Sequence, residues 1–295
     1  MTADRLARFY RSAGHQVVDF GGVTWFDASP RVLQSLPGVR LVDPPREELE
    51  RHLRARRLAG VQFATHAEYG LPSCAYAVRD SAYSLDSIDR AFRQNVLRGM
   101  RSCQVRELDF GAAERLGPAV NREALARRGS RDPRFLDPAR WRQFCAAGRD
   151  TPGAGALGSF QAGRLAAYLV YLIDGGVCHG LHMLSSDWGR PYRSNHLLYF
   201  EFTRRMIARP DVDCVSTGLK PIPAAGDMDR FKREAGYRTE PCRLAAVLHP
   251  VVERSLLARP ADALLAGMAG LRPHDARLRR VRAVSELARA SLPRL

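Results

Sequence analysis

The sequence predicts an α/β (α+β) fold in which a mixed sheet is flanked by helices. Apolar runs bounded by glycine turns indicate strands, and apolar residues that recur every fourth position indicate helices. Segments of the two kinds alternate along the chain. The chain has 295 residues, of which 45% are hydrophobic, so it is long enough to bury a core without disulfides.

The first 150 residues are predicted to form an N-terminal α/β domain. Leu6, Phe9 and Tyr10 have helical spacing, and two strand-like runs, 16–20 and 23–27, flank a Gly-Gly turn. Ile88, Phe92 and Val96 recur every fourth residue before Gly99, which can end a helix. The other predicted elements are strands at 61–65, 75–79 and 103–108 and helices at 45–57, 112–128 and 138–147.

Gly148–Gly155 is rich in glycine and is predicted to be a loop at a domain boundary. The second predicted domain, 151–250, begins with a three-stranded meander. Its strands are predicted at 156–161, 164–173 and 177–184, with Ala162-Gly163 and Gly175-Gly176 as the turns.

A helix, a strand, a short helix and a strand follow the meander. Leu198, Phe202 and Met206 form one face of the first helix, and a strand is predicted at 214–217. The short helix runs from Asp227, its predicted N-cap, to Gly236, and the last strand is 243–249. Residues 251–295 are predicted to be a helical, arginine-rich tail, with arginines that could face tRNA or only solvent: Arg272, Arg277, Arg279, Arg280 and Arg282.

The six cysteines lie far apart, without a CxxC pair or zinc-ligand spacing, so we expect reduced thiols and no metal. The sequence has neither a signal-peptide pattern nor an apolar run long enough to span a membrane, and we expect a cytoplasmic protein.

A formal net charge of +15 and a pI near 10.3 favour an anionic partner. Lysine occurs only at Lys220 and Lys232, so almost all the positive charge is arginine. Because a GC-rich coding sequence would produce the same bias, the charge by itself leaves open whether RNA is bound.

Two segments near the end of the second domain carry a recognisable motif. Ser216-Thr-Gly218 ends a predicted strand, and Phe231-Lys-Arg-Glu-Ala-Gly-Tyr237 forms the short helix and its stop. This arrangement resembles the Fem-type (FemAB-like) branch of the GNAT superfamily of acyltransferases. The resemblance covers residues 156–249 and extends more faintly to 88–108.

The resemblance implies transfer of an acyl or aminoacyl group from a thioester or a charged tRNA to an amine. It also implies two GNAT-like halves, of which the N-terminal half here would be a degenerate copy. Ordinary GNAT enzymes cradle the coenzyme A pyrophosphate with a Q/RxxGxG/A loop. The matching loop, 185–195, has a single glycine and lacks that pattern, so the sequence does not establish coenzyme A as the donor.

The predicted catalytic residues are Lys232, His182 and Asp187. Lys232 could place a point charge on a phosphate or a developing oxyanion. His182 or Asp187 could remove the amine proton. Because His179 and His182 are three apart on a predicted strand, simple alternation places them on opposite faces of the sheet, which excludes a metal pair.

The predicted donor-binding residues surround two loops. Arg190, Arg193 and Asn195 precede the long helix, where the two arginines could neutralise donor phosphates. Lys220 and Phe231 lie on either side of the later loop, and Phe231 has a second interpretation as a core residue.

We expect direct attack of an acceptor amine on the donor carbonyl, polarised by backbone amides of strand 177–184, without a covalent enzyme intermediate. The proton could go to His182, to Asp187 or to water. The donor would be an acyl-CoA or an aminoacyl-tRNA, and the acceptor a small-molecule or peptide amine. A third hypothesis is a non-catalytic RNA- or partner-binding protein; no membrane partner is expected.

Overall fold

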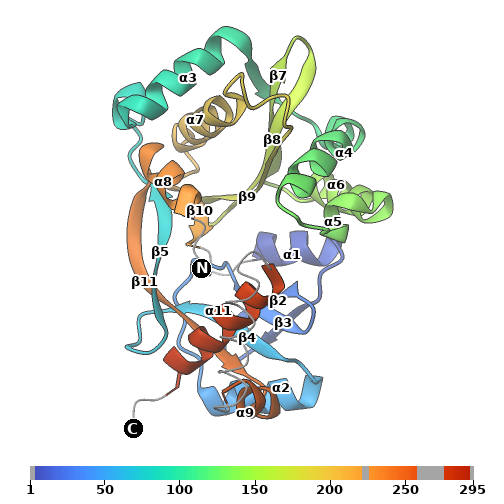
Figure 1. Cartoon of the computed structure of the whole chain (residues 1–295), viewed down its shortest axis with the longest axis vertical. Coiled ribbons are helices and arrows are strands. Elements are labelled where there is room, and N and C mark those ends of the chain that lie inside the picture. The colour runs from blue at the N-terminus through green and yellow to red at the C-terminus, as the bar shows by residue number, and fades with distance from the viewer. Residues whose placement is uncertain (1–3, 221–225, 258–275, 293–295) are drawn as a thin grey trace. The chain divides into compact units, whose positions relative to one another are not determined.

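The structure is a computed structural model that describes residues 4–220, 226–257 and 276–292 (Figure 1). The chain divides into two compact units. Unit 1 contains Met1–His15, Tyr76–Gly218 and Arg230–Thr239, and unit 2 contains Gln16–Ala75, Leu219–Asp229 and Glu240–Leu295. Residues 76–150, which the sequence groups with the N-terminal domain, therefore lie in the same unit as residues 151–218.

The strands of unit 1 follow the order β10-β9-β8-β7-β6. Strands β6 to β9 are antiparallel neighbours, and β10 runs parallel to β9. The predicted meander is confirmed, and its first turn uses Ala162 and Gly163 with positive φ angles of 47° and 79°, as a tight hairpin requires. The strands are β6 (Gln104–Glu107), β7 (Ala154–Gln161), β8 (Arg164–Asp174), β9 (Val177–Ser185) and β10 (Cys214–Leu219).

Helices cover both faces of the unit 1 strands (Figure 1). One face packs through a core that includes Phe9, Trp141 and Val170 against α1 (Asp4–Ser12), α4 (Phe110–Arg127), α5 (Pro133–Leu136) and α6 (Pro138–Asp150). The other face packs against α7 (Ser194–Ile207), where the rings of Tyr171 and Phe202 lie 5.8 Å apart. Helix α3 (Arg90–Ser102) lies beside α7, so the sheet is buried from both sides.

The predicted loop at Gly148–Gly155 is wrong over most of its length. Helix α6 continues to Asp150 and β7 begins at Ala154, so only residues 151–153 connect them. Gly148 belongs to the helix because the ring of Phe110 lies against it: a Cβ atom there would be 2.2 Å from Phe110 Cε1. The glycine signal thus reflects close packing of α6 and α4, not a turn.

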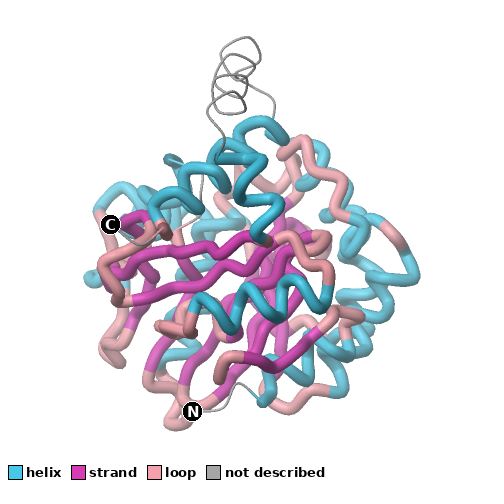
Figure 2. The backbone as a smooth tube through the Cα atoms, turned by 90° about the horizontal axis from the view of Figure 1, so that it is seen from below, coloured by secondary structure: helices cyan, strands magenta, loops and turns pink. Residues whose placement is uncertain are grey.

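In unit 2 the strands follow the order β1-β2-β3-β4-β11. Trp25, Phe63 and Leu53 belong to one buried cluster beneath α2 (Arg46–Arg56). Strand β3 has no counterpart among the predicted elements. Figure 2 shows the strands in magenta and the helices in cyan. The strands are β1 (Val17–Phe20), β2 (Val23–Ser29), β3 (Val32–Leu36), β4 (Gly60–Thr65), β5 (Leu71–Val78) and β11 (Arg238–Leu248), and β5 and β11 have residues in both units.

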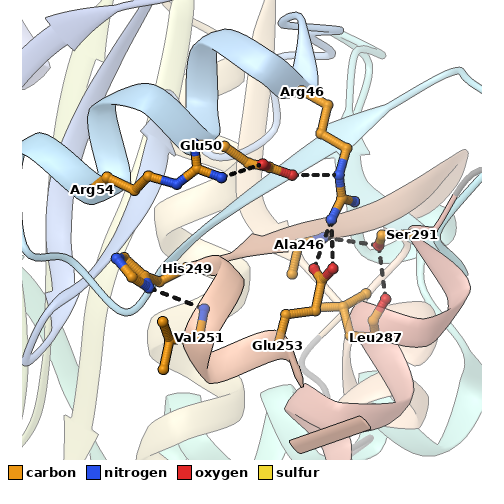
Figure 3. Close-up of polar contacts among 9 residues, drawn as sticks. All are labelled: Arg46, Glu50, Arg54, Ala246, His249, Val251, Glu253, Leu287 and Ser291. Carbon is orange, nitrogen blue, oxygen red and sulfur yellow. Dashed lines mark hydrogen bonds and ion pairs between the residues drawn. The ribbon is translucent and has the colours of Figure 1, made fainter. Parts of the chain in front are cut away.

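Polar contacts join α2 to α9 (Pro250–Leu257) and hold the end of α11 (Ala276–Ala290) against β11, all within unit 2 (Figure 3). Arg46 binds both carboxylate oxygens of Glu253, at 2.8 and 2.7 Å, and one oxygen of Glu50 at 2.9 Å. The Ser291 hydroxyl accepts from the Ala246 N–H at 3.0 Å. Of the predicted tRNA-facing arginines, Arg282 is exposed and pairs with Glu286, whereas Arg272 lies outside the described residues.

The two units share one succession of elements. In unit 1 the hairpin β7-β8 leads to β9, α7 and the parallel strand β10; in unit 2 the hairpin β1-β2 leads to β3, α2 and the parallel strand β4. Each parallel pair has a register of three residue pairs, which in unit 2 runs from Val32↔Gly60 to Gln34↔Gln62. The same chain path therefore occurs in both units.

Candidate active site

Strands β9 and β10 separate part of the way along their length. Their parallel register pairs Val177–His179 with Cys214–Ser216 and then ends, although β9 continues to Ser185 and β10 to Leu219. Residues 180–183 of β9 are half-exposed between buried ends of the strand. After His179, therefore, β9 has no β10 partner, and residues 180–185 of β9 are called its open edge below.

A β-bulge lies at the start of this open edge. Tyr171 of β8 pairs with Gly180 and Val170 pairs with His182, so Leu181 has no partner in the β8 register. A bulge of this kind bends a strand and redirects its side chains. It explains why β9 turns away from β10 directly after their last pair.

The bulge corrects the prediction that His179 and His182 face opposite sides. His179 pairs with Leu172 and His182 with Val170, two β8 residues that share one face. Both histidines therefore point to the α4–α6 face, because the extra residue, Leu181, shifts the alternation by one position. Even so, among the described residues no group of three or more His, Cys, Asp or Glu side chains could hold a metal ion.

His182 lies against aromatic rings of the helices on that face. Its ring is 4.9 Å from that of Phe135 and 5.4 Å from that of Phe144. Burial and the charge of Arg134 lower the pKa of His182 to about 3, and burial lowers the pKa of His179 to about 4. Both imidazoles are therefore neutral at pH 7.

The depressed pKa of buried His179 predicts acid sensitivity. An unfolded histidine takes up a proton near pH 6.5, whereas folded His179 does so only near pH 4, so the free energy of unfolding falls as the pH drops below 6.5. We expect His179→Gln to reduce the fall between pH 7 and pH 5 by about 2 kcal/mol, measured by urea unfolding. His66→Gln, at an exposed position, is the control; equal pH dependence in both variants would contradict the prediction.

Lys232 is buried beside the end of β10. It belongs to α8 (Gly226–Glu234), is 7% exposed, and donates from Nζ to the Thr217 carbonyl at 2.7 Å. The same ammonium lies 4.3 Å from the ring centre of Tyr76. The structure thus places this predicted catalytic residue on the backbone of the Ser216-Thr-Gly218 motif.

A set of hydroxyl groups supports the same strand end, and the sequence analysis missed it. The Tyr199 hydroxyl donates to Thr217 Oγ1 at 2.9 Å, and the Thr203 and Tyr237 hydroxyls are 2.7 Å apart. Burial raises the pKa of both Tyr199 and Tyr237, so both are neutral phenols at pH 7. Tyr199 and Thr203 are four apart on α7, a spacing that marks a polar stripe on its buried face.

Phe231 packs into an aromatic cluster between α3 and α7. Its ring lies 5.1 Å from Phe92, 5.2 Å from His196 and 5.1 Å from Tyr199. The ring therefore fixes α8 against the helices, next to Lys232.

The loop between β9 and α7 holds the other predicted residues of unit 1. Asp187 forms an ion pair with Arg127 of α4, and its N–H donates to Glu123 at 2.7 Å. Arg190 is exposed. The single glycine of the loop, Gly189, packs against β8, because a Cβ there would lie 2.8 Å from that of Ala166.

Arg193 and Asn195 stand at the N-terminus of α7. Arg193 has a left-handed backbone with φ of 58° and makes no side-chain cap. Asn195 donates to the Ser185 hydroxyl at 3.0 Å, while its buried Oδ1 has no hydrogen-bond partner among the described residues. The first N–H groups of α7 are therefore not capped by the Arg193 side chain. Exposed Arg190 and half-buried Arg193 come directly before them in the chain.

Lys220 belongs to unit 2, unlike the other predicted residues. Its N–H donates to the Cys74 carbonyl at 2.8 Å, and its ammonium lies 3.6 Å from Asp229. The two lysines of the chain thus have different surroundings: one is buried on a carbonyl, and the other is paired near the surface.

The meander, the bulged strand β9, the diverging parallel strand β10 and the helix between them define a GNAT-type fold. The solved structures that the chain resembles include FemX, at a TM-score of 0.55 and 10% identity over 85% of this chain and 92% of FemX. They also include the C-terminal domain of a putative lysylphosphatidylglycerol synthetase from Agrobacterium fabrum, at a TM-score of 0.57 and 15% identity over 91% of each chain. A third is L-PGS from Bacillus licheniformis, at a TM-score of 0.50 and 14% identity over 82% of this chain and 87% of that one.

Identities this low show the fold, and at that level the resemblance to the Fem-type branch is confirmed. No family model matches the chain, and no curated protein sequence matches it. Within the described part of the chain, no helix is long and apolar enough to cross a membrane.

Proposed function

We propose that this chain is a transferase that moves an acyl or aminoacyl group from an activated donor to an amine. The observation that carries the proposal is the separation of β9 and β10 after the His179–Ser216 pair. Backbone N–H groups at such an edge can donate to a donor carbonyl and stabilise the oxyanion that forms when an amine attacks. FemX and the lysylphosphatidylglycerol synthetase domain, whose fold the chain shares, agree with a transferase role.

The donor would enter beside α7. Its phosphates would meet the first N–H groups of this helix and the guanidinium groups of Arg190 and Arg193. Because Gly189 packs against β8 and does not cradle a ligand, side-chain charge takes the role that a glycine-rich loop has in ordinary GNAT enzymes. This requirement is met by an acyl-CoA or by the 3′ end of an aminoacyl-tRNA.

Among the predicted bases, the geometry favours water as the proton acceptor. Asp187 is held by Arg127. His182, with a pKa of about 3, is too weak a base to take the amine proton at pH 7. Lys232 holds the Thr217 carbonyl, so in this proposal it positions the strand end.

Donor binding tests the proposal. Acetyl-CoA, longer acyl-CoAs and aminoacyl-tRNA are each added to the protein at low and moderate salt, with melting temperature and transfer of labelled acyl group to an amine as readouts. We expect one donor to raise the melting temperature and to support transfer. A tRNA donor would lose affinity steeply with salt, whereas a CoA thioester would lose much less.

Arg193→Gly separates binding from stability. Glycine adopts the left-handed backbone of this position without strain. We therefore expect the free energy of unfolding to stay the same or to rise by up to about 1 kcal/mol. The stabilisation by donor should nevertheless fall, because a guanidinium beside the phosphates is lost. Unchanged donor binding in this variant, or no donor that supports transfer, would refute the proposed site.

A further inference from the structure

Two adjacent arginines at the end of α4 reach the open edge of β9 in different ways. Arg127 is ion-paired with Asp187 and donates to the Ser185 carbonyl at 3.1 Å. Arg128 donates to the Met183 carbonyl at 3.4 Å and is exposed. No carboxylate of the described residues forms an ion pair with Arg128, so one guanidinium of the two has its charge available.

Arg128 contacts β9 within the segment that no longer pairs with β10. Met183 follows His182 directly and belongs to the half-exposed segment 180–183, where β9 has left β10. Arg128 lies on the α4–α6 face of the sheet, opposite α7, and its charge is felt at His182, where it helps to lower the pKa. In the proposed function the donor lies by Arg190 and Arg193 at the start of α7, so an acceptor held by Arg128 would approach β9 from the other face.

The charges around His182 do not balance. Asp132 is the carboxylate that acts on the imidazole, and it is already paired with Arg134 at 2.6 Å. Arg128 adds a second guanidinium without a second carboxylate. Partial desolvation and the neighbouring charge of Arg127 lower the pKa of Arg128, so a bound anion would stabilise its charged form.

We infer that Arg128 binds an anionic group, a carboxylate or a phosphate, that the acceptor carries next to its amine. The inference rests on the proposed function and adds the class of acceptor. A guanidinium has five N–H donors in a planar fork, and one of them reaches Met183, so others remain to hold two oxygens of an anion. Held there, the anion would orient the amine toward the donor carbonyl at the open edge of β9.

Binding is tested first, without any need for turnover. Protein with isotope-labelled histidine is titrated with inorganic phosphate and, separately, with acetate, and the His182 signal, assigned through His182→Gln, is followed by nuclear magnetic resonance. We expect the signal to shift, and the affinity to fall about tenfold in Arg128→Gln. Arg122→Gln, on the exposed surface of the same helix, removes the same charge and should leave the titration unchanged.

Transfer then separates the two kinds of anion. With the donor that supports transfer, ethanolamine is compared with phosphoethanolamine, and alaninamide with alanine. We expect the anionic member of one pair to be the better acceptor by about tenfold, and this preference to disappear in Arg128→Gln but to persist in Arg122→Gln. The pair that shows the preference identifies phosphate or carboxylate.

The anion titration and the transfer assay test different claims. If no donor supports transfer, the proposed function fails while the titration still decides whether Arg128 is an anion site. An unshifted His182 signal, or equal affinities in Arg128→Gln and the wild type, overturns the inference even if transfer is observed. Arg128→Lys should restore part of the affinity, because it returns the charge but not the fork.

Discussion

Lys232→Met is expected to abolish most of the transfer activity and to lower the stability of the protein. The ammonium is 7% exposed, donates to the Thr217 carbonyl at 2.7 Å and lies over the Tyr76 ring. Methionine fills the space but leaves a carbonyl at the end of β10 without its donor, which costs about 1–3 kcal/mol. Displacement of that strand end by about 1 Å is enough to lower the transfer rate about 100-fold.

Lys220→Met is the matched control, because the chain has only these two lysines. Its ammonium lies 3.6 Å from Asp229 with about a third of the side chain exposed, so its loss should change the free energy of unfolding by less than about 1 kcal/mol. Urea unfolding and steady-state transfer measure both variants. Equal stability of the two lysine variants would show that the bond to Thr217 does not support the strand.

Gly180→Val is expected to close the gap between β9 and β10. A Cβ at Gly180 would lie 3.3 Å from Thr217 Cγ2 and 3.6 Å from the ring of Phe202, and the two methyl groups of valine need space beyond it. Overpacking of this kind costs about 1–3 kcal/mol. Because Gly180 is the first residue after the last β9–β10 pair, we also expect transfer to fall about 100-fold, with the donor displaced from the open edge.

Two further variants separate blocking from simple destabilisation. Gly180→Ala needs only a shift of a few tenths of an ångström and should retain most of the activity. Gly155→Val, in β7, would place its Cβ 2.4 Å from the Tyr171 hydroxyl and should destabilise unit 1 without blocking the edge. Full activity of Gly180→Val, measured on folded protein, would remove the open edge from the mechanism.

The elements that the sequence predicted well are those whose signal is local. Glycine at a positive φ ends strands or helices regardless of the rest of the chain, as at Gly163 and Gly236. The meander and the end of α8 follow from such signals, and α3 and α7 follow from four-residue spacing. The predicted stop at Gly99 is wrong, because α3 continues to Ser102 and Gly99 packs against Leu197 of α7, where a Cβ would lie 2.8 Å from that of Leu197. Gly148 misled the prediction because its glycine serves the packing of Phe110, a residue 38 positions away that no local pattern identifies.

The candidate site was predictable in part. The motif around Phe231 and Lys232 located the region, and the rarity of lysine singled out Lys232. The bond from Lys232 to Thr217, the Tyr199 hydroxyl on Thr217 and the position of Arg128 on Met183 join residues far apart in the sequence. Such pairs have no spacing rule, so they appear only when the chain is folded.

By itself the sequence determined the alternation of helices and strands, the turns of the meander and the short helix that stops before Gly236, because backbone preference and apolar spacing act over a few residues. The predicted N-cap, Asp227, is wrong, since α8 already begins at Gly226. Only the tertiary structure decided which face His179 and His182 occupy, where β9 leaves β10 and which arginine keeps its charge available. A single bulged residue, Leu181, reverses the side-chain alternation, and an ion pair such as Arg127–Asp187 forms only when the helix reaches the loop. Both depend on contacts between distant segments, which local pattern does not encode.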